Sequence, residues 1–403
     1  MKFNKKHKDI FIRLEKTEKK VCFLAGTKKI LAFNPNAEYK YKISQKNNQF
    51  EKFANEQLKK GRILIGFISY DLGYEVHNIK PTAKNDLKLP DINFYAYEDW
   101  IEDDKIICKK GKYIQKIEEI LKRPIKNINE EKSKNFEPET KRQNYNKSYK
   151  KIKDYIKEGD IYQINLTHRL KAKTKRDGKE LFTKIIETQN VDHLAYIEGD
   201  GFEILSASPE QFIQIKKRNI TTTPIKGTRP RGKTEKEDKK LREELENSEK
   251  EKAELNMITD LLRNDIGKCC KAGTVRVTKN RIIKEYPAVW HSYSEIVGEL
   301  SAKYTNIQTL ISMLPGGSIT GCPKKRAIEI IDELETTRRS VYTGNIGYIK
   351  PNHDLEFSIA IRTIIKKKED LYLQVGGGIV LDSSEKSEFK ETLDKAASFM
   401  KLL

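Results

Sequence analysis

The chain has 403 residues, of which 37% are hydrophobic and 34% are charged, a composition typical of a globular protein with a large core. No segment approaches the roughly 20 apolar residues of a membrane-spanning helix, and residues 1–10 contain no apolar export signal, so we expect a cytoplasmic protein without a membrane partner. The formal net charge of +20 comes with lysines spread along the whole chain, which favours a solvated surface and no nucleic-acid partner. Five cysteines without C-x-x-C spacing predict reduced thiols, and neither a disulfide framework nor a zinc site.

Residues 1–122 are predicted to be a β-rich region. Short apolar runs such as residues 21–25 and 63–70 are broken by polar turns, a pattern typical of strands. Residues 123–147 are polar and contain two prolines, so we interpret them as a connecting segment.

Residues 148–403 form the larger region, in which predicted strands alternate with long helices. A helix is predicted over residues 149–157, where tyrosines and isoleucines share one face, and a strand over residues 161–167. Further helices are predicted over residues 236–264, 323–335 and 382–403, and strands over residues 355–365 and 371–375. This mixture predicts an α+β protein whose N-terminal region is intertwined with the rest.

The most informative motif is Thr-Pro-Ile-Lys-Gly-Thr-Arg-Pro-Arg-Gly at residues 223–232. Pro224 and Pro230 restrict the backbone, and Gly227 allows close approach to a ligand, so we expect a stiff turn that presents the amine of Lys226. An amine held in this way can act as a nucleophile. The alternative is that Lys226 is one more surface lysine of a lysine-rich chain.

Glu254 and Glu391 lie on separate predicted helices, and each could direct a carboxylate inward. Carboxylates, together with substrate oxygens and water, are the ligands that Mg²⁺ prefers. The spacing also fits two surface glutamates, and Glu391 with Lys395 forms an ordinary i,i+4 pair.

Two glycine-rich segments could bring backbone amides close to an anion. Residues 314–324 have the glycine spacing of a nucleotide-binding loop, but Cys322 stands where that loop requires lysine, so nucleotide binding is disfavoured. Gly376, Gly377 and Gly378 follow a predicted strand and could approach a carboxylate.

Three further side chains are candidates for binding or proton transfer. Arg362 is in a predicted apolar strand, where a buried guanidinium needs an anion, either a substrate carboxylate or a structural Asp or Glu. His291 and Glu210 could donate protons or hydrogen bonds, although each, taken alone, is more often structural.

These segments, in this order and spacing, resemble the chorismate-utilising enzyme family from about residue 140 to the C-terminus, with a weaker similarity at residues 63–74. The resemblance implies a fold of two large, mainly antiparallel sheets packed as an orthogonal sandwich with helices on the outside. It also assigns residues 148–403 to the chorismate-binding catalytic region. The segments that carry it are the Lys226 motif and residues 253–265, 315–324, 342–348, 361–363 and 376–395.

The resemblance further implies roles for individual residues. Mg²⁺ would be held by Glu254 and Glu391, with Glu210 as our candidate acid and His291 as a supporting donor. The carboxylates of chorismate would be bound by Tyr342, Arg362, Lys395 and the backbone of Gly376, Gly377 and Gly378, with Gly227 and Thr228 nearby.

Branches of the family differ in the nucleophile that attacks chorismate. The isochorismate and salicylate branch has a lysine base where this chain has Gln163, so activation of water is disfavoured. The loop reads P-I-A-G-T in anthranilate synthases and commonly P-I-K-G-T in aminodeoxychorismate synthases, and Lys226 matches the second form.

The resemblance therefore implies amino transfer to chorismate through a covalent Lys226 intermediate, giving 4-amino-4-deoxychorismate for para-aminobenzoate and folate synthesis. The alternative is component I of anthranilate synthase, which would give anthranilate and pyruvate. The chain has no G-x-C-x-G glutaminase motif, so ammonia is expected from a separate glutamine amidotransferase subunit.

Overall fold

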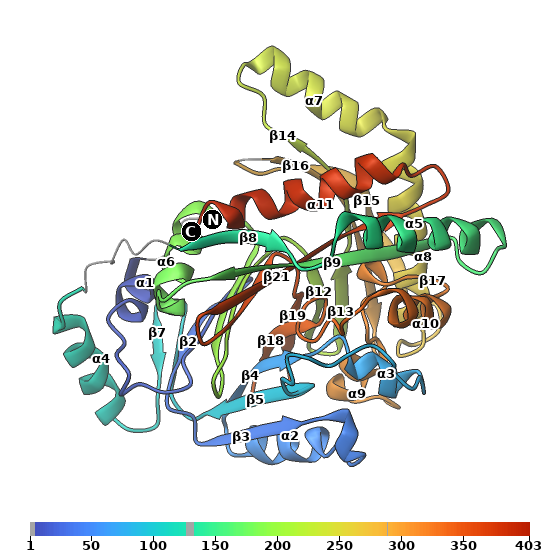
Figure 1. Ribbon diagram of the computed structural model, residues 1–403. Coiled ribbons are helices and arrows are strands. Elements are labelled where there is room, and N and C mark those ends of the chain that lie inside the picture. The colour runs from blue at the N-terminus through green and yellow to red at the C-terminus, as the bar shows by residue number, and fades with distance from the viewer. Residues whose placement is uncertain (1–4, 126–132, 288) are drawn as a thin grey trace.

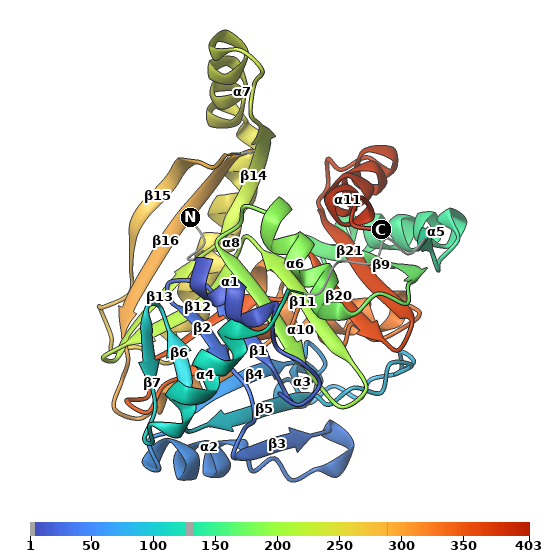
Figure 2. The ribbon, with the colours of Figure 1, turned by 90° about the vertical axis from the view of Figure 1, so that its left-hand side faces the viewer.

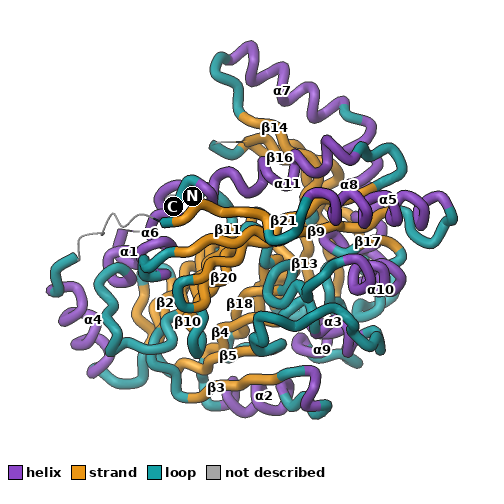
Figure 3. Tube along the Cα trace, in the orientation of Figure 1, coloured by secondary structure: helices purple, strands orange, loops and turns teal. Residues whose placement is uncertain are grey.

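The computed structural model describes residues 5–125, 133–287 and 289–403. Its strands form two large antiparallel sheets, one of 11 strands and one of 10, and helices lie around them (Figures 1 and 3). This confirms the predicted α+β architecture with two large sheets. No helix in the described ranges is long and apolar enough to cross a membrane.

The 11-stranded sheet, here called sheet A, collects strands from the whole length of the chain. Its longest contact joins β9 and β21, which pair from Lys173 opposite Asp370 to Ile164 opposite Ile379. In spatial order its strands are β17 (Gly321–Cys322), β9 (Gln163–Lys173), β21 (Asp370–Ile379), β20 (Thr363–Lys367), β11 (Glu203–Ser208), β10 (His193–Glu198), β1 (Cys22–Ala25), β2 (Lys29–Ala32), β6 (Trp100–Glu102) and β7 (Lys105–Ile107), and β8 (Lys134–Pro138) also pairs with β9.

The 10-stranded sheet, here called sheet B, is also built from both halves of the chain. In spatial order its strands are β14 (Ile225–Pro230), β16 (Val289–Glu299), β13 (Asn219–Thr223), β12 (Gln211–Lys216), β19 (Leu355–Ile359), β18 (Asn345–Ile349), β4 (Ile63–Ile68), β5 (Ile92–Tyr97) and β3 (Ala37–Tyr41), and β15 (Arg276–Glu285) also pairs with β16.

The helices of the described residues lie outside the two sheets (Figure 3). They are α1 (Lys5–Phe11), α2 (Phe50–Lys59), α3 (Leu72–Val76), α4 (Lys112–Lys122), α5 (Arg142–Lys157), α6 (Gly178–Thr188), α7 (Glu235–Asn247), α8 (Glu249–Gly267), α9 (Asn306–Ser312), α10 (Lys324–Leu334) and α11 (Glu385–Met400).

Strands of residues 1–122 belong to both sheets. β1, β2, β6 and β7 form one end of sheet A, and β3, β4 and β5 form one end of sheet B. The N-terminal region therefore completes both sheets and does not form a sheet of its own. Residues 1–4 of this region and residues 126–132 of the connecting segment lie outside the described residues.

The described part of the connecting segment contains regular structure that the sequence analysis did not predict. β8 pairs with β9, and α5 begins at Arg142 and not at residue 149. This first part of α5 is polar apart from Tyr145, which is buried, so its apolar periodicity is too weak to reveal a helix.

The predicted helix over residues 236–264 is in fact two helices, α7 and α8. Ser248 between them has a ψ of 106°, outside the helical region, and its side chain accepts a hydrogen bond from the Glu251 N–H. Serine followed three residues later by glutamate is a helix start signal, and the continuous run of charged residues concealed it. α7 consequently projects from the body of the protein (Figure 1).

The predicted strand over residues 355–365 is also divided. β19 ends at Ile359 in sheet B and β20 begins at Thr363 in sheet A, so the residues between them carry the chain from one sheet to the other. Arg362 in this connection has a φ of +50°, a left-handed conformation that strands do not contain. The apolar composition on both sides concealed the turn.

The core consists of three clusters of buried apolar side chains. One packs sheet B against helices such as α2 and α8, with Phe357 and Ile258 among its members. The second covers sheet A beneath α1, α6 and α11 and contains Phe182 and Phe399. The third, which contains Phe67 of β4, joins strands of sheet B to strands of sheet A. Burial of these side chains holds the two sheets and their helices in fixed positions.

Candidate functional site

Lys226 lies in strand β14. The stiff turn that we expected from the two prolines is therefore wrong. β14 pairs with β16, and the pairing register shifts between Ile225 and Thr228. Lys226 and Gly227 are the residues at this shift, which frees them from regular pairing. Gly227 has a φ of +87°, and a Cβ there would lie 2.7 Å from Leu245 Cδ1, so a larger residue would be strained.

The Lys226 side chain faces other residues of the predicted site. A Cβ built on Gly378 would lie 3.7 Å from Lys226 Nζ and 2.6 Å from Gln163 Nε2, so these three residues meet. Gln163 is 2% exposed, and its Oε1 has no hydrogen-bond partner among the described residues. Lys226 Nζ also donates to the carbonyl oxygen of Ser318 at 3.5 Å. The positive charge of Lys226 acts on the carboxyl groups of Glu210, Glu254 and Glu391.

Glu210 is a buried acid between β11 and β12, only 6% exposed. Burial raises the pKa of its carboxyl group to about 7, although the Ser318 hydroxyl and the ammonium groups of Lys226 and Lys395 act in the opposite direction. A carboxyl group with this pKa is partly protonated at neutral pH and can donate a proton. The geometry is compatible with the predicted role of Glu210 as the acid, which stays a prediction.

Glu254 on α8 and Glu391 on α11 lie close to a third carboxylate, Glu388 on α11. Glu388 is 2% exposed and accepts a hydrogen bond from the Ser383 hydroxyl at 2.7 Å. Burial raises the pKa of Glu254, and repulsion by Glu388 and Glu391 raises it further. We call Glu254, Glu388 and Glu391 the carboxylate cluster. Lys226 belongs to β14, and Glu388 and Glu391 belong to α11; Figure 2 shows where these two elements lie.

Lys395 lies between the carboxylate cluster and sheet A. Its Nζ is 2.7 Å from Glu391 Oε1 and donates to the carbonyl oxygen of Gly376 at 3.0 Å. Burial opposes ionisation of Glu391, but the Lys395 ammonium outweighs it and lowers the pKa of the carboxyl group. The predicted i,i+4 pair therefore exists, and it also connects α11 to the backbone of β21.

Lys250, on the first turn of α8, also contacts the carboxylate cluster. Its Nζ lies 3.8 Å from Glu254 Oε1 and 3.5 Å from Glu388 Oε1. The ammonium thereby joins two helices, and its side chain is still 52% exposed.

The carboxylate cluster suits a hard divalent cation by the chemistry of its donors. Gly377 adjoins two of the carboxylates, since a Cβ there would lie in van der Waals contact with them, 3.4 Å from Glu388 Oε2 and 3.9 Å from Glu391 Oε1. Within the described ranges, no group of three or more His, Cys, Asp or Glu side chains is arranged so that it could hold a metal ion by itself. An incomplete protein set suits Mg²⁺, which keeps water and takes substrate oxygens as ligands. Binding of Mg²⁺ stays a prediction.

His291 on β16 lies opposite Thr228 on β14, and its Nδ1 is 2.8 Å from Thr228 Oγ1. Burial, with a contribution from the Arg362 guanidinium, lowers the pKa of His291 to about 4. The imidazole is therefore uncharged at neutral pH and can exchange hydrogen bonds without adding positive charge. The same interaction shows that the Arg362 guanidinium lies near His291.

Arg362 occupies the connection between the two sheets, and its predicted place inside a strand is wrong. Burial lowers the pKa of its guanidinium, and no carboxylate of the described residues acts on that pKa in the opposite direction. A buried cation without an anionic partner costs free energy. Of the two alternatives that the sequence left open for Arg362, a structural carboxylate is thus not found in the described part of the chain, and a ligand carboxylate is favoured.

Tyr342 lies apart from the Lys226 group. It is 4% exposed, and burial raises the pKa of its phenol beside the ion pair of Arg339 and Glu335. The residue after Tyr342 donates its N–H to the carbonyl oxygen of Ala360 at 2.8 Å, so this turn adjoins the connection that contains Arg362. Contacts among the described residues do not join Tyr342 directly to Lys226.

Gly376, Gly377 and Gly378 lie within β21, and the prediction that they follow a strand is wrong. They are paired with residues 165–167 of β9, so part of their backbone hydrogen bonding is used within sheet A. Their lack of side chains provides space, as the contacts of Gly378 with Lys226 show. The strand prediction ended too early because glycine is uncommon inside strands.

Sequence reasoning missed Glu388, Lys250 and Ser318. A signal for Glu388 was present, because Glu388, Glu391 and Lys395 have the i, i+3 and i+7 spacing of one helical face. Lys250 precedes Glu254 by four residues on the same helix, a spacing that places it beside Glu254, whereas its contact with Glu388 joins segments far apart in the chain. Ser318 approaches the site only through such long-range packing, so local spacing does not reveal it.

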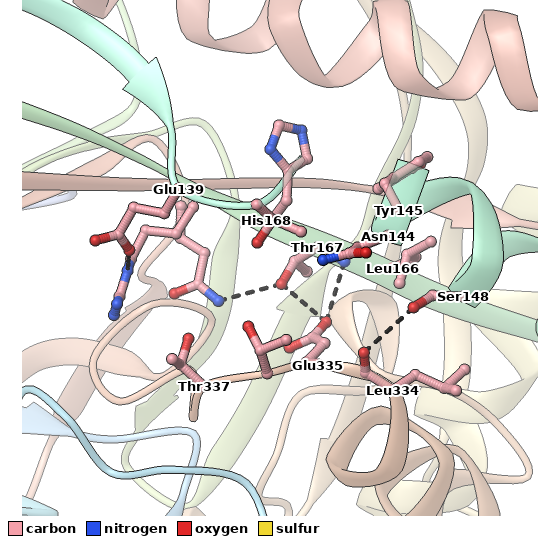
Figure 4. A pocket seen from close by; sticks show the side chains of 14 residues that line it. Glu139, Asn144, Tyr145, Ser148, Leu166, Thr167, His168, Leu334, Glu335 and Thr337 are labelled. Carbon is pink, nitrogen blue, oxygen red and sulfur yellow. Dashed lines mark hydrogen bonds and ion pairs between the residues drawn. The ribbon is translucent and has the colours of Figure 1, made fainter. Parts of the chain in front are cut away.

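A separate cavity of about 260 Å³ lies between α5, β9 and the loop after α10 (Figure 4). Residues predicted for the site do not line it. Glu335 accepts hydrogen bonds from the Thr167 N–H and hydroxyl at 3.0 and 2.8 Å, and the Ser148 hydroxyl donates to the carbonyl oxygen of Leu334 at 3.3 Å. These lining groups are therefore paired with one another.

The chain is similar to known proteins in both sequence and structure. Residues 10–401 match the family described as chorismate binding enzyme. The chain is 36% identical over 358 residues to the aminodeoxychorismate synthase component 1 of Bacillus subtilis (strain 168), covering 84% of this chain and 76% of that protein. It is 38% identical over 270 residues to the anthranilate synthase component 1 of Aquifex aeolicus (strain VF5), covering 67% of this chain and 55% of that protein. The crystal structure of anthranilate synthase component I from Streptococcus pneumoniae TIGR4 is similar with a TM-score of 0.84 and 30% identity, covering 93% of this chain and 92% of that one.

Proposed function

Because this chain belongs to the chorismate binding enzyme family, we propose that it is component I of an aminodeoxychorismate synthase, which converts chorismate and ammonia to 4-amino-4-deoxychorismate and water. The observation that carries the proposal is the meeting of the Lys226 amine, the buried acid Glu210 and the carboxylate cluster in one site. The similarity to the Bacillus subtilis protein supports the same assignment.

In the proposed reaction Lys226 is the nucleophile. Its uncharged amine adds to ring carbon 2 of chorismate, both ring double bonds shift, and the carbon 4 hydroxyl leaves as water with a proton from Glu210. Ammonia then adds to carbon 4, both double bonds shift back, and the Lys226 nitrogen leaves carbon 2. The Lys226 nitrogen keeps its two protons, is positively charged while it is bonded to carbon 2 and leaves as the uncharged amine, and a proton from the added ammonia restores Glu210.

The remaining residues of the site bind and orient the reactants. Arg362, which has no carboxylate partner among the described residues, pairs with one carboxylate of chorismate, and Lys395 lies beside Glu391 and Gly376. Tyr342, in the turn that adjoins the connection of Arg362, is a further candidate for binding a carboxylate. His291 and Thr228 exchange a hydrogen bond beside Arg362. The free Oε1 of Gln163 accepts a hydrogen bond from the attacking nitrogen. Fixing the reactants in this way replaces a large part of the entropy cost of bringing them together.

Glu254 and Glu391, with Glu388 beside them, are the residues that would hold Mg²⁺. When bound, Mg²⁺ supplies positive charge that stabilises the negative charge of the ligand and of the departing oxygen. The chain's own contribution is to hold the carboxylates on two helices whose positions the core fixes. Ammonia is expected from a glutamine amidotransferase subunit, since the sequence contains no glutaminase motif.

The proposal is tested by incubating the protein with chorismate, ammonium and Mg²⁺ and separating the products by chromatography, with and without an added aminodeoxychorismate lyase. We expect 4-amino-4-deoxychorismate, which the lyase converts to para-aminobenzoate. Lys226→Ala should lower the rate by at least about 10³-fold because the covalent route is lost. Lys252→Ala, which removes an ammonium paired with Glu249, is the matched control. A Lys226→Ala rate equal to that of the wild type would show that the covalent route is wrong.

Component I of anthranilate synthase is the second candidate, because two of the similar proteins carry that name. It predicts fluorescent anthranilate and pyruvate from chorismate and ammonium without any lyase. The same chromatography separates the two candidates. Anthranilate in the absence of lyase would contradict the first one.

A further inference from the structure

Lys250 has contacts that an ordinary surface lysine lacks. Its Nζ lies 3.8 Å from Glu254 Oε1 on its own helix and 3.5 Å from Glu388 Oε1 on α11, 138 residues away in the chain. The Glu388 side chain is 3% exposed, and that of Glu254 is 15% exposed. The ammonium group therefore points from solvent into the carboxylate cluster.

The pairing of Lys250 with Glu254 alone would be an ordinary i,i+4 pair of small energy. The contact of Lys250 with Glu388 is not of this ordinary kind, because Glu388 is buried and belongs to another helix. Lys250 thus neutralises two carboxylates, of which Glu254 is one that the proposed function assigns to Mg²⁺. Its half-exposed stem lets the ammonium leave without breaking the core.

We propose that the Lys250 ammonium competes with a divalent cation for Glu254 and Glu388 and thereby sets the metal affinity of the site. The inference rests on the proposed function, in which a divalent cation binds the carboxylate cluster. A lysine ammonium and a hydrated metal ion both need the carboxylate oxygens, and two cations at this separation repel each other. Binding of the metal therefore requires the Lys250 side chain to move toward solvent.

Removal of the ammonium should strengthen metal binding. Lys250→Met keeps most of the apolar stem and deletes the charge, and we expect it to bind Mg²⁺ about 3- to 10-fold more tightly than the wild type at low salt, with a smaller difference at high salt. Lys250→Arg keeps the charge and should stay within about 2-fold of the wild type.

The matched control is Lys252→Met on the same turn of α8. It changes the net charge of the protein by the same amount, but the Lys252 ammonium pairs with Glu249 at 2.7 Å and not with the carboxylate cluster. Its Mg²⁺ affinity should equal that of the wild type within about 2-fold. Circular dichroism and thermal unfolding of each variant show that the chain is folded.

Affinity is measured without chorismate, by calorimetric titration with Mg²⁺ and by the electron paramagnetic resonance signal of free Mn²⁺. Tighter binding by Lys250→Met alone supports the inference. Equal or weaker binding by Lys250→Met, an equal gain in Lys252→Met, or no metal binding by the wild type would overturn it. Failure of the proposed function looks different, since chorismate and ammonium would then give no 4-amino-4-deoxychorismate even where the wild type binds Mg²⁺.

Discussion

Two polar regions of this protein, the site around Lys226 and the cavity in Figure 4, differ in how their charged side chains are paired. Around the cavity, Arg169 forms ion pairs with Asp86 and Glu139, and Glu335 forms one with Arg339. Each of these charges has its partner within the protein. Bonds of this kind hold strands and loops together and leave no charge for a ligand to neutralise.

The site around Lys226 contains polar groups that the described residues leave without a partner. The buried guanidinium of Arg362 meets no carboxylate there, and Gln163 Oε1 accepts no hydrogen bond. Tyr145 and His168 at the cavity also have one free polar atom each, but both are aromatic rings packed on Phe389 of α11. An unpaired buried charge is therefore a better indicator of a ligand site than an open volume.

The largest expected effect is on Arg362, whose charge the protein itself does not pair. Arg362→Met should lower kcat/KM for chorismate by about 10³-fold, because a buried arginine–carboxylate pair is lost, and should leave the free energy of unfolding equal or higher, because an unpaired cation is removed. Steady-state kinetics and urea unfolding measure both. Arg362→Lys keeps the positive charge but cannot form a bidentate pair with a carboxylate, so its loss of kcat/KM should be smaller than that of Arg362→Met. If Arg362→Met instead lost stability and kept its kcat/KM, Arg362 would be a structural residue, and its charge would no longer distinguish the Lys226 site from the cavity.

A smaller loss is expected for Glu210→Gln, about 10²-fold in kcat, because the proton donor is removed. In the wild type the rate should fall as the pH rises above about 7, where Glu210, whose pKa burial raises to about 7, loses its proton; the variant should lack this dependence. Glu203→Gln, at a partly buried glutamate whose pKa burial also raises, should keep the wild-type pH–rate profile.

Stability should depend on Glu210 with a defined sign. Burial raises the pKa of this group in the folded chain from an ordinary value of 4.5 to about 7, so the folded state binds the proton more tightly than the unfolded state does. The resulting stabilisation is complete below pH 4.5 and is lost as the pH rises to about 7. Urea unfolding between pH 4.5 and 7.5 should show this loss in the wild type and a flatter profile in Glu210→Gln.

The converse experiment targets the paired region. Arg169→Met should destabilise the fold by about 2 kcal/mol, because Asp86 and Glu139 lose their partner while remaining partly open to water. Activity per folded molecule should change by less than about 2-fold. Urea unfolding and rates measured well below the transition temperature decide this. If Arg169→Met kept the wild-type free energy of unfolding and lost activity, the cavity would have a functional role.

The smallest expected effect is at Gly227. Gly227→Ala should cost about 1 to 2 kcal/mol of stability, because alanine is strained at a φ of +87° and its Cβ would lie 2.7 Å from Leu245 Cδ1. Gly159→Ala is the matched control, since Gly159 has a φ of +82° but no atom within 4 Å of its would-be Cβ. Its cost should come from the backbone alone and be lower, with unchanged activity. Equal costs would show that no close contact limits the position beside Lys226.

The sequence predicted some parts of the fold well and others poorly, for reasons that particular residues show. α10 and α11 lie within one to three residues of their predicted ends, because their apolar periodicity is strong. The break at Ser248 and the turn at Arg362 were missed because neighbouring residues of the same character concealed a local change of conformation. The assignments of Lys226, Glu254 and Glu391 came from a family resemblance, and their chemical roles stay predictions.

What the sequence determined by itself is the family, from motifs that are local in the chain, and an α+β architecture, from local apolar patterns; the two large sheets were implied by the family resemblance. Only the tertiary structure decided that Glu388 lies beside Lys250 and Glu254, and that Arg362 stands between the two sheets without a carboxylate partner among the described residues. The physical reason is that local periodicity indicates which face of its own element a side chain occupies, whereas the meeting of elements more than a hundred residues apart depends on how helices and sheets pack around the shared core.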